Sequence, residues 1–340
     1  MTDAARAERF SENKRSVSMG LRAIVESPAD KRLELIKALY HPEATTFAFC
    51  PVDNLSGVTE IYESLWQPLL GAIDNASRQD RIIVSGEYDS REMVAIHGTL
   101  NGTLTSDLFD IPAGGESVQL RYCEVHSVEA LRIKHSWILV DLLDLMQQVR
   151  CWPLAPSTGR EVAWPEPEAA PATDRVDLET GQQTLDVTLA MQSALSEFDG
   201  DSLDSMPHNS YWADSFGWYG PAGIGVTHGM TEFRAHHQIP FLHAFPDRRG
   251  GDHYVRMGDG EFSVTGGWPS VRATHTGANW MGMPPTGKFI GMRVMDFYRC
   301  EDGKLAENWV PIDIIDILRQ MGVDVFARLR HLTGRFETTL

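Results

Sequence analysis

The chain has 340 residues, about the length of two ordinary domains. Its composition, 42% hydrophobic and 23% charged, is typical of a globular protein, and no apolar run is long enough to cross a bilayer. The formal net charge of −17 argues against a nucleic-acid partner, because such binding depends on basic patches. The N-terminus lacks the apolar core of a signal peptide, so we expect a cytoplasmic protein without membrane contacts.

The first half of the chain predicts helices followed by strands. Residues 1–17 are expected to form an N-terminal tail, and helices are expected at about 18–40 and 58–73. Alternating apolar and polar residues, typical of antiparallel strands, follow. Residues 151–180 are rich in Pro, Ala and Glu, which predicts an extended linker because proline has no N–H to donate.

The second half repeats this plan. Helices are expected at about 180–199 and 230–245, with Pro240 kinking or ending the second, and an aromatic-rich loop at 211–225 between them. Strands are predicted at about 254–258, 261–276, 288–300 and 305–311, with a tight turn at Asp302-Gly303. A short helix starts at Asp313. Helices followed by a run of strands indicate an α+β fold.

An internal repeat links the two halves. Residues 111–148 align with 283–320 without a gap. The matched pairs include Pro112 with Pro284, Arg121 with Arg293, Glu124 with Asp296, Trp137 with Trp309, Asp141 with Asp313 and Gln148 with Gln320. We therefore predict a tandem duplication, with domains at 18–150 and 181–335.

The second copy resembles a known family. Its segment PPTGKFIGMRVMDFYRCEDGKLAENWVPIDIIDILRQMG is similar to the C-terminal half of SnoaL-like polyketide cyclases, or ester cyclases, of the nuclear-transport-factor-2-like superfamily. The resemblance covers about residues 186–323; the first copy lacks both the PTG and the DGK turn. It implies two tandem cone-shaped α+β barrels, each a curved antiparallel sheet wrapped by helices around one pocket. It also implies acid/base chemistry by an aspartate matching Asp313, with no metal and no organic cofactor.

The residues themselves leave two roles open for Asp313. The turn at 302–303 places Trp309 near Met295 and Asp313 near Gly291, so Trp309, Asp313 and Arg293 share one face of the sheet. Asp313 can be a pocket acid/base with a raised pKa, or it can cap the following helix. Asp296 alternates to the opposite face, where a salt bridge or an interface contact is expected, and it is the second candidate acid.

The remaining candidates are histidines and aromatic residues. His275 or His237 would polarise a substrate oxygen, and His243 lies on the same predicted helix. The histidine spacings match no zinc motif, so no metal site is predicted. Trp309, Trp268 and Trp280 are expected to line the cavity, while Trp212, Trp218 and Tyr219 either stack on the substrate or plug the open end of the barrel. A second pocket would use Asp141, Trp137, Arg121 and His97 of the first copy.

These features predict a cofactor-independent acid/base enzyme of the cyclase, isomerase, dehydratase or hydrolase type. It would act on a small oxygenated organic molecule in the second-domain pocket. The alternative is a tandem protein that binds a small molecule without catalysis. We expect the two domains to form an intramolecular pseudo-dimer, with a homodimer as a further possibility.

Overall fold

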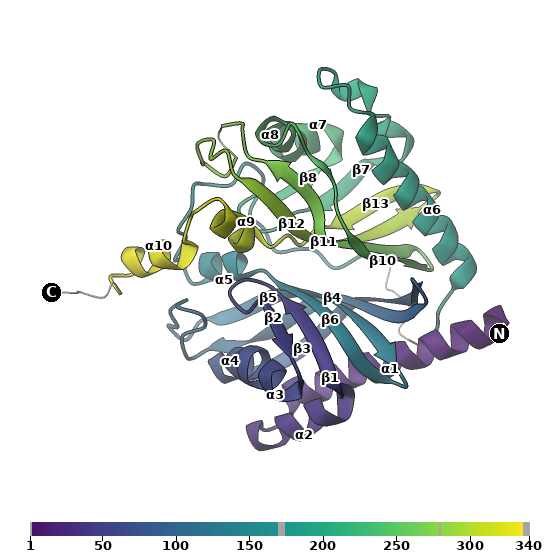
Figure 1. Ribbon diagram of the computed structural model, residues 1–340, viewed down its shortest axis with the longest axis vertical. Coiled ribbons are helices and arrows are strands. Elements are labelled where there is room, and N and C mark those ends of the chain that lie inside the picture. The colour runs from purple at the N-terminus through teal and green to yellow at the C-terminus, as the bar shows by residue number, and fades with distance from the viewer. Residues whose placement is uncertain (1, 169–173, 279, 336–340) are drawn as a thin grey trace.

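The computed structural model describes residues 2–168, 174–278 and 280–335 and contains two mixed β-sheets, each covered by helices (Figure 1). The first sheet has the strand order β2-β1-β6-β5-β4-β3. Its elements are α1 (Asp3–Glu26), α2 (Ala29–Leu39), β1 (Tyr40–Ala48), β2 (Asn54–Ser56), α3 (Val58–Ile61), the π-helical turn η1 (Tyr62–Trp66), α4 (Gln67–Ala72), β3 (Ile73–Tyr88), β4 (Arg91–Leu104), β5 (Ser117–Glu129), β6 (Arg132–Val140) and α5 (Leu142–Gln148).

The second sheet has the order β10-β11-β12-β13-β7-β8, and β9 pairs with β11 at its edge. Its elements are α6 (Leu178–Ala194), the short 3₁₀ turns Leu195–Glu197, Leu203–Ser205 and His208–Ser210, β7 (Trp212–Tyr219), β8 (Val226–His228), α7 (Gly229–Phe233), the π-helical turn η5 (Arg234–Gln238), α8 (Ile239–Ala244), β9 (Arg249–Gly250), β10 (His253–Asp259), β11 (Phe262–Thr274), β12 (Phe289–Glu301), β13 (Lys304–Trp309), α9 (Ile314–Gln320) and α10 (Val325–Leu332). The two sheets have the same topology, which confirms the predicted duplication and the α+β class.

The two sheets pack against each other, and most helices cover their outer faces (Figure 1). We call the layer between the sheets the seam. Trp137 of β6 stacks on Tyr254 of β10 with ring centroids 4.3 Å apart. His97 of β4 lies 5.7 Å from Trp309 of β13. Each sheet therefore has a seam face toward the other domain and an inner face toward its own helices.

The linker runs along the seam. Trp164 is buried, stacks on His97 at 5.4 Å between ring centroids, and donates a hydrogen bond to the carbonyl of Gly220 at 2.9 Å. The predicted linker extended to residue 180, but α6 begins at Leu178 with Asp177 as its N-cap. Residues 169–173 of the predicted linker lie outside the described residues.

Two local predictions were wrong, and one of the two outcomes expected at Pro240, a kink or an end of the helix, is excluded. Residues 3–17 belong to α1 rather than to a tail; Phe10 and Val17 are buried, and Lys14 reaches Asp259 of the second domain at 2.6 Å. The aromatic segment that was expected to be a loop is largely strand β7. Pro240 does not end the helix, since it stands in the first turn of α8, where its missing N–H is not needed.

The β12–β13 register differs from the predicted one by two residues. Trp309 pairs with Phe297, not Met295, and an irregularity between Arg299 and Cys300 accounts for one of the two residues. A shift of two preserves the alternation of side chains between the faces. The predicted set of residues on one face was therefore correct although its partners were not.

Candidate functional site

The inner face of the second sheet carries the carboxyl group of Asp296 on β12. Thr265 of β11 is its direct partner across the ladder, and Tyr298 follows two residues later on the same strand. Asn308 of β13 is the cross-strand partner of Tyr298. Alternate and paired residues share a face, so these four side chains point toward the same helices.

Asp296 has an unusual protonation equilibrium. Burial raises its pKa to about 7, and the groups that oppose this effect, Tyr298 and Asn308, are uncharged hydrogen-bond partners. The residue nevertheless keeps part of its surface accessible. A carboxyl group with a pKa near neutrality can both accept and return a proton at physiological pH.

A polar group from α6 completes this arrangement. The Gln192 Nε2 atom donates to Thr265 Oγ1 at 2.7 Å and to the Tyr298 hydroxyl at 3.3 Å. Burial raises the pKa of Tyr298 well above its ordinary value, so this hydroxyl stays neutral and can donate a hydrogen bond. Asp296 thus has neutral donors beside it.

An aromatic wall stands next to these polar groups. Trp218 of β7 is the cross-strand partner of Asn308 and stacks on His237 with centroids 4.0 Å apart. His237 belongs to η5, and Phe233 and Phe241 also contact its ring. Burial lowers the pKa of His237 to about 3, so its imidazole is neutral. The wall is therefore aromatic and uncharged.

Several buried polar atoms around this wall have no hydrogen-bond partner within the described residues. They are His208 Nδ1, Trp212 Nε1, Thr227 Oγ1, His237 Nδ1 and Gln238 Oε1. The Gln238 Nε2 and His208 Nε2 atoms lie 3.2 Å apart. Buried polar atoms are normally paired, so water or a ligand would have to satisfy these groups.

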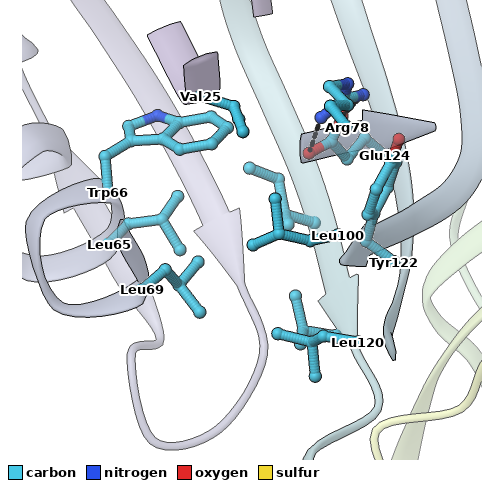
Figure 2. Close-up of a pocket in the computed structure, with 11 residues that line it drawn as sticks. Val25, Leu65, Trp66, Leu69, Arg78, Leu100, Leu120, Tyr122 and Glu124 are labelled. Atoms are coloured by element: carbon cyan, nitrogen blue, oxygen red, sulfur yellow. Dashed lines mark hydrogen bonds and ion pairs between the residues drawn. The ribbon is translucent and has the colours of Figure 1, made fainter. Parts of the chain in front are cut away.

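The first domain has the same geometry with different chemistry (Figure 2). Glu124 stands at the position of Asp296, and Arg78 of β3 donates to its two oxygens at 2.6 and 3.2 Å. Arg78 also donates to Asp80 at 2.7 Å, and its guanidinium lies 4.2 Å from the Tyr122 ring centroid. Burial favours neutral Glu124, but the Arg78 charge outweighs it, and the pKa of Glu124 falls to about 2.

The interior of the first domain is nearly filled. Its cavity measures about 20 Å³, which is room for roughly one water molecule. The lining residues are Val25, Leu65, Trp66, Leu69, Arg78, Leu100, Leu120, Tyr122, Glu124, Ile138 and Val140. The helical turn η1 supplies Leu65 and Trp66 where η5 supplies His237 and Gln238 in the second domain.

Asp313, the first candidate acid from sequence, lies at the seam. It is the N-cap of α9, where its Oδ1 atom accepts from the Asp316 backbone N–H at 3.1 Å. Its Oδ2 atom accepts from Arg293 at 3.1 Å and from the backbone N–H of Cys50, in the first domain, at 2.9 Å. Burial and the Asp316 charge raise the pKa of Asp313 to about 7, while Arg293 opposes them. This geometry favours the capping role, because both oxygens are already engaged.

Asp141 of the first domain makes the equivalent contacts with the second domain. It is the N-cap of α5, and its Oδ2 atom accepts from the backbone N–H of Ala222, in the second domain, at 3.0 Å. Arg121 lies 3.3 Å from this oxygen. Cys50 and Ala222 are separated by the same 172 positions as Asp141 and Asp313. We call this pair of contacts the seam clasp.

The other residues predicted for the first-domain pocket also lie at the seam. Trp137 stacks on Tyr254, and His97 packs among Trp164, Trp309 and Phe297. Burial lowers the pKa of His97 to about 3. Asp141, Trp137, Arg121 and His97, predicted to form a pocket in the first domain, lie on the face of the sheet that meets the second domain and the linker rather than the helices of the first.

The predicted residues of the second domain divide into three places. Trp309, Arg293, Tyr219 and Trp268 lie at the seam; Tyr219 is 5.2 Å from Trp309 between ring centroids, and the Arg293 guanidinium is 5.0 Å from the Trp268 centroid. His275 and Trp280 both pack on Phe245 beyond the end of β11, and His243 is exposed on α8. Trp212, Trp218 and His237 surround Phe233 on the inner side.

Sequence reasoning missed the polar groups beside Asp296. Tyr298, Asn308, Gln192 and Thr265 were not singled out, and neither was Arg78. One signal was available for two of them: Tyr298 and Asn308 align with His126 and Ser136 of the first copy, which hydrogen-bond each other at 2.9 Å. Polar residues at matching inward positions of both copies indicate an interior that is not purely apolar.

Within residues 2–168, 174–278 and 280–335, three or more His, Cys, Asp or Glu side chains do not gather in a metal-binding arrangement. None of the helices described is both long and apolar enough to cross a membrane.

The sequence identifies the family. The sequence pattern of SnoaL-like polyketide cyclases matches residues 69–149 and 189–321, once in each domain. The two matches together cover more than half of the chain, which therefore belongs to the SnoaL-like polyketide cyclase family. Among curated proteins no match is found.

Several solved structures are similar to a single domain. A putative SnoaL-like polyketide cyclase from Jannaschia sp. CCS1 is 10% identical and covers 41% of this chain and 92% of its own, with a TM-score of 0.35. IdmH, a putative polyketide cyclase from Streptomyces antibioticus, is 16% identical and covers 41% of this chain and 98% of its own, with a TM-score of 0.34. AclR, a putative hydroxylase from Streptomyces galilaeus, is 15% identical and covers 43% and 86%, with a TM-score of 0.35.

Proposed function

We propose that this protein is an acid/base enzyme that works without a cofactor on a small oxygenated organic molecule, inside the second domain, and that Asp296 is its proton-transferring group. One observation carries the proposal. Asp296 is a carboxyl group on the inner face whose pKa is raised to about 7, with neutral hydrogen-bond partners and part of its surface accessible. Environments that move a pKa toward neutrality are characteristic of catalytic carboxyl groups.

The chemistry follows from the neighbours of this carboxyl group. Ionised Asp296 would take a proton from a carbon beside a substrate carbonyl, and the neutral Tyr298 hydroxyl would stabilise the oxygen that gains charge. Protonated Asp296 would then return the proton to carbon or to a leaving oxygen. Cyclisation, isomerisation and dehydration share this first step. The Trp218–His237 wall would hold the flat part of the substrate.

Hydrogen exchange at carbon tests this step without a known substrate. A panel of uncharged ketones and β-keto esters is incubated with the protein in D₂O, and deuterium incorporation is followed by mass spectrometry. We expect exchange above the buffer rate for at least one compound, and a loss of about 10²–10⁴-fold in Asp296→Asn.

The first domain offers a matched control. Glu124→Gln removes the carboxyl group at the same position of the other copy, and it should leave exchange within about twofold under conditions where both variants are folded. Exchange that survives unchanged in Asp296→Asn, or that disappears equally in Glu124→Gln, would contradict the assignment. Exchange by no compound of the panel would favour a binding protein over an enzyme.

We also propose that the two domains act as an intramolecular pseudo-dimer. The seam clasp supports this, since each domain donates a backbone N–H to the helix-capping aspartate of the other. Sedimentation of the purified chain would test it: a monomer of 38.0 kDa supports the idea, and a stable homodimer would mean that further interfaces are needed.

A further inference from the structure

The two copies differ at one position that decides what occupies their interiors. Arg78 of β3 pairs with Leu100 of β4, which pairs with Leu120 of β5. In the second domain, Gly250 of β9 pairs with Val271 of β11, which pairs with Met292 of β12. Strand pairing and the 172-residue repeat therefore both place Gly250 where the first domain has Arg78.

Arg78 fills the interior of the first domain (Figure 2). Only 5% of the residue is exposed, and its guanidinium is held by Glu124 and Asp80 at 2.6–2.7 Å. Tyr122 covers one face of the guanidinium. The remaining cavity of about 20 Å³ has no room for an organic molecule. The long side chain thus occupies the space that leads to the inner carboxyl group.

The second domain has no side chain at the position of Arg78, where Gly250 stands. A Cβ atom added at Gly250 would meet no other atom within 4 Å. The residue is exposed on a two-residue edge strand, and its backbone φ does not lie in the range that favours glycine. Among the described residues, no arginine is recorded as acting on the Asp296 carboxyl group, which keeps accessible surface.

We propose that the second domain binds its substrate in the space that Arg78 fills in the first domain, that the substrate reaches Asp296 past Gly250, and that it is an uncharged molecule presenting a carbonyl or hydroxyl oxygen. The chemistry of the surroundings argues for an uncharged molecule. Tyr298, Asn308, Gln192 and Thr265 are neutral, and the described groups that act on the Asp296 carboxyl include no cation, so a carboxylate or phosphate buried beside it would have no charge partner among them. This inference rests on the proposed function and specifies its site.

Copying the arginine into the second domain tests the inference. In Gly250→Arg, the guanidinium should reach Asp296 as Arg78 reaches Glu124. The carboxyl pKa, followed by ¹³C NMR of labelled aspartate and assigned with Asp296→Asn, should fall from about 7 by more than one unit. Deuterium exchange should fall at least tenfold. Gly250→Met fills the same space without charge; it should reduce exchange without lowering this pKa.

Gly71→Arg is the matched control. Gly71 is also exposed, and an added Cβ there also meets no atom within 4 Å, but it lies on α4 of the first domain. This variant should leave both the Asp296 pKa and the exchange rate unchanged. Urea unfolding of each variant establishes that it is folded.

The outcomes separate this inference from the proposed function. An unchanged Asp296 pKa in folded Gly250→Arg would overturn the inference, because the space at Gly250 would then not lead to the carboxyl group. A lowered pKa with undiminished exchange would support the location of the space and refute catalysis by Asp296. In the first domain, Arg78→Ala should bind added ethylguanidinium and regain thermal stability, whereas no effect of ethylguanidinium would refute the role of Arg78 as the occupant.

Discussion

Replacing Asp296 by asparagine should stabilise the protein at alkaline pH, and the size of this effect follows from its pKa. The carboxyl pKa rises from 3.8 to about 7 in the folded chain. Each pKa unit corresponds to about 1.4 kcal/mol, so ionising the buried group costs at most about 4 kcal/mol. Relaxation and the remaining accessibility of the side chain reduce this limit, and we expect about 2–4 kcal/mol.

The direction of the pH dependence is fixed by the sign of the pKa change. Because the folded chain holds this proton to a higher pH than the unfolded chain does, its stabilising contribution is complete below pH 3.8 and is lost as the pH rises through about 7. The amide of Asp296→Asn does not ionise. The variant and the wild type should therefore differ by less than about 1 kcal/mol at pH 4.5 and by the full amount at pH 8.

Urea unfolding between pH 4.5 and 8 measures this difference in unfolding free energy. The slope of the free energy against urea concentration is compared between the variants and should be equal. Asp313 has a similarly raised pKa, but it is present in both proteins, so it cancels in the difference. Asp186→Asn, which makes the same substitution at an exposed position on α6, is the control. If the unfolding free energies of Asp296→Asn and wild type change with pH in parallel, the proposed environment of Asp296 is refuted.

Three further predictions concern stability. Asp313→Ala removes a helix cap and a buried acceptor, which should cost about 2–4 kcal/mol in urea unfolding, and Asp141→Ala should cost a similar amount; a cost below about 0.5 kcal/mol in both would contradict the seam clasp. Lys14→Met should cost about 3–5 kcal/mol, because it leaves Asp259 buried without its cation, and a melting temperature equal to that of wild type would argue against this. The stability that ionised Glu124 contributes through its lowered pKa should be lost between pH 4.5 and about 2. The difference in unfolding free energy between wild type and Glu124→Gln should therefore shrink from pH 6 to pH 3. A constant difference would exclude the ion pair as its source.

Sequence alone predicted the duplication, the fold class and the alternation of side chains, because these depend on local patterns. The repeat aligned Arg121 with Arg293, Trp137 with Trp309 and Asp141 with Asp313, all of which lie at the seam. Even with a two-residue error in register, Trp309, Arg293 and Asp313 were correctly placed on one face. Alternation fixes which residues share a face, and this information is present in a single strand.

Sequence could not tell which face meets the helices and which meets the other domain. Both faces of β12 are largely buried, one carrying Met295 and Phe297 and the other carrying Val294 and Tyr298. Neither set is polar enough to mark a surface. The decision depends on docking between the domains, through long-range contacts such as that of Asp313 with Cys50. A carboxyl group flanked by aromatic residues therefore indicated a pocket although it lies in an interface.

Duplication gives a physical reason for the asymmetry of the two interiors. The seam requires both copies, since each capping aspartate accepts an N–H from the other domain, so neither copy can be lost. The interior of each copy is free to change, because it contacts only its own helices. In the first copy, Arg78 and Glu124 neutralise each other and fill the space. In the second, glycine replaces the arginine, and the described partners of the Asp296 carboxyl group are the neutral Tyr298 and Asn308, so its ionisation is expected to cost stability above pH 7. A buried carboxyl group that costs stability when it ionises is expected where function, rather than folding, requires it.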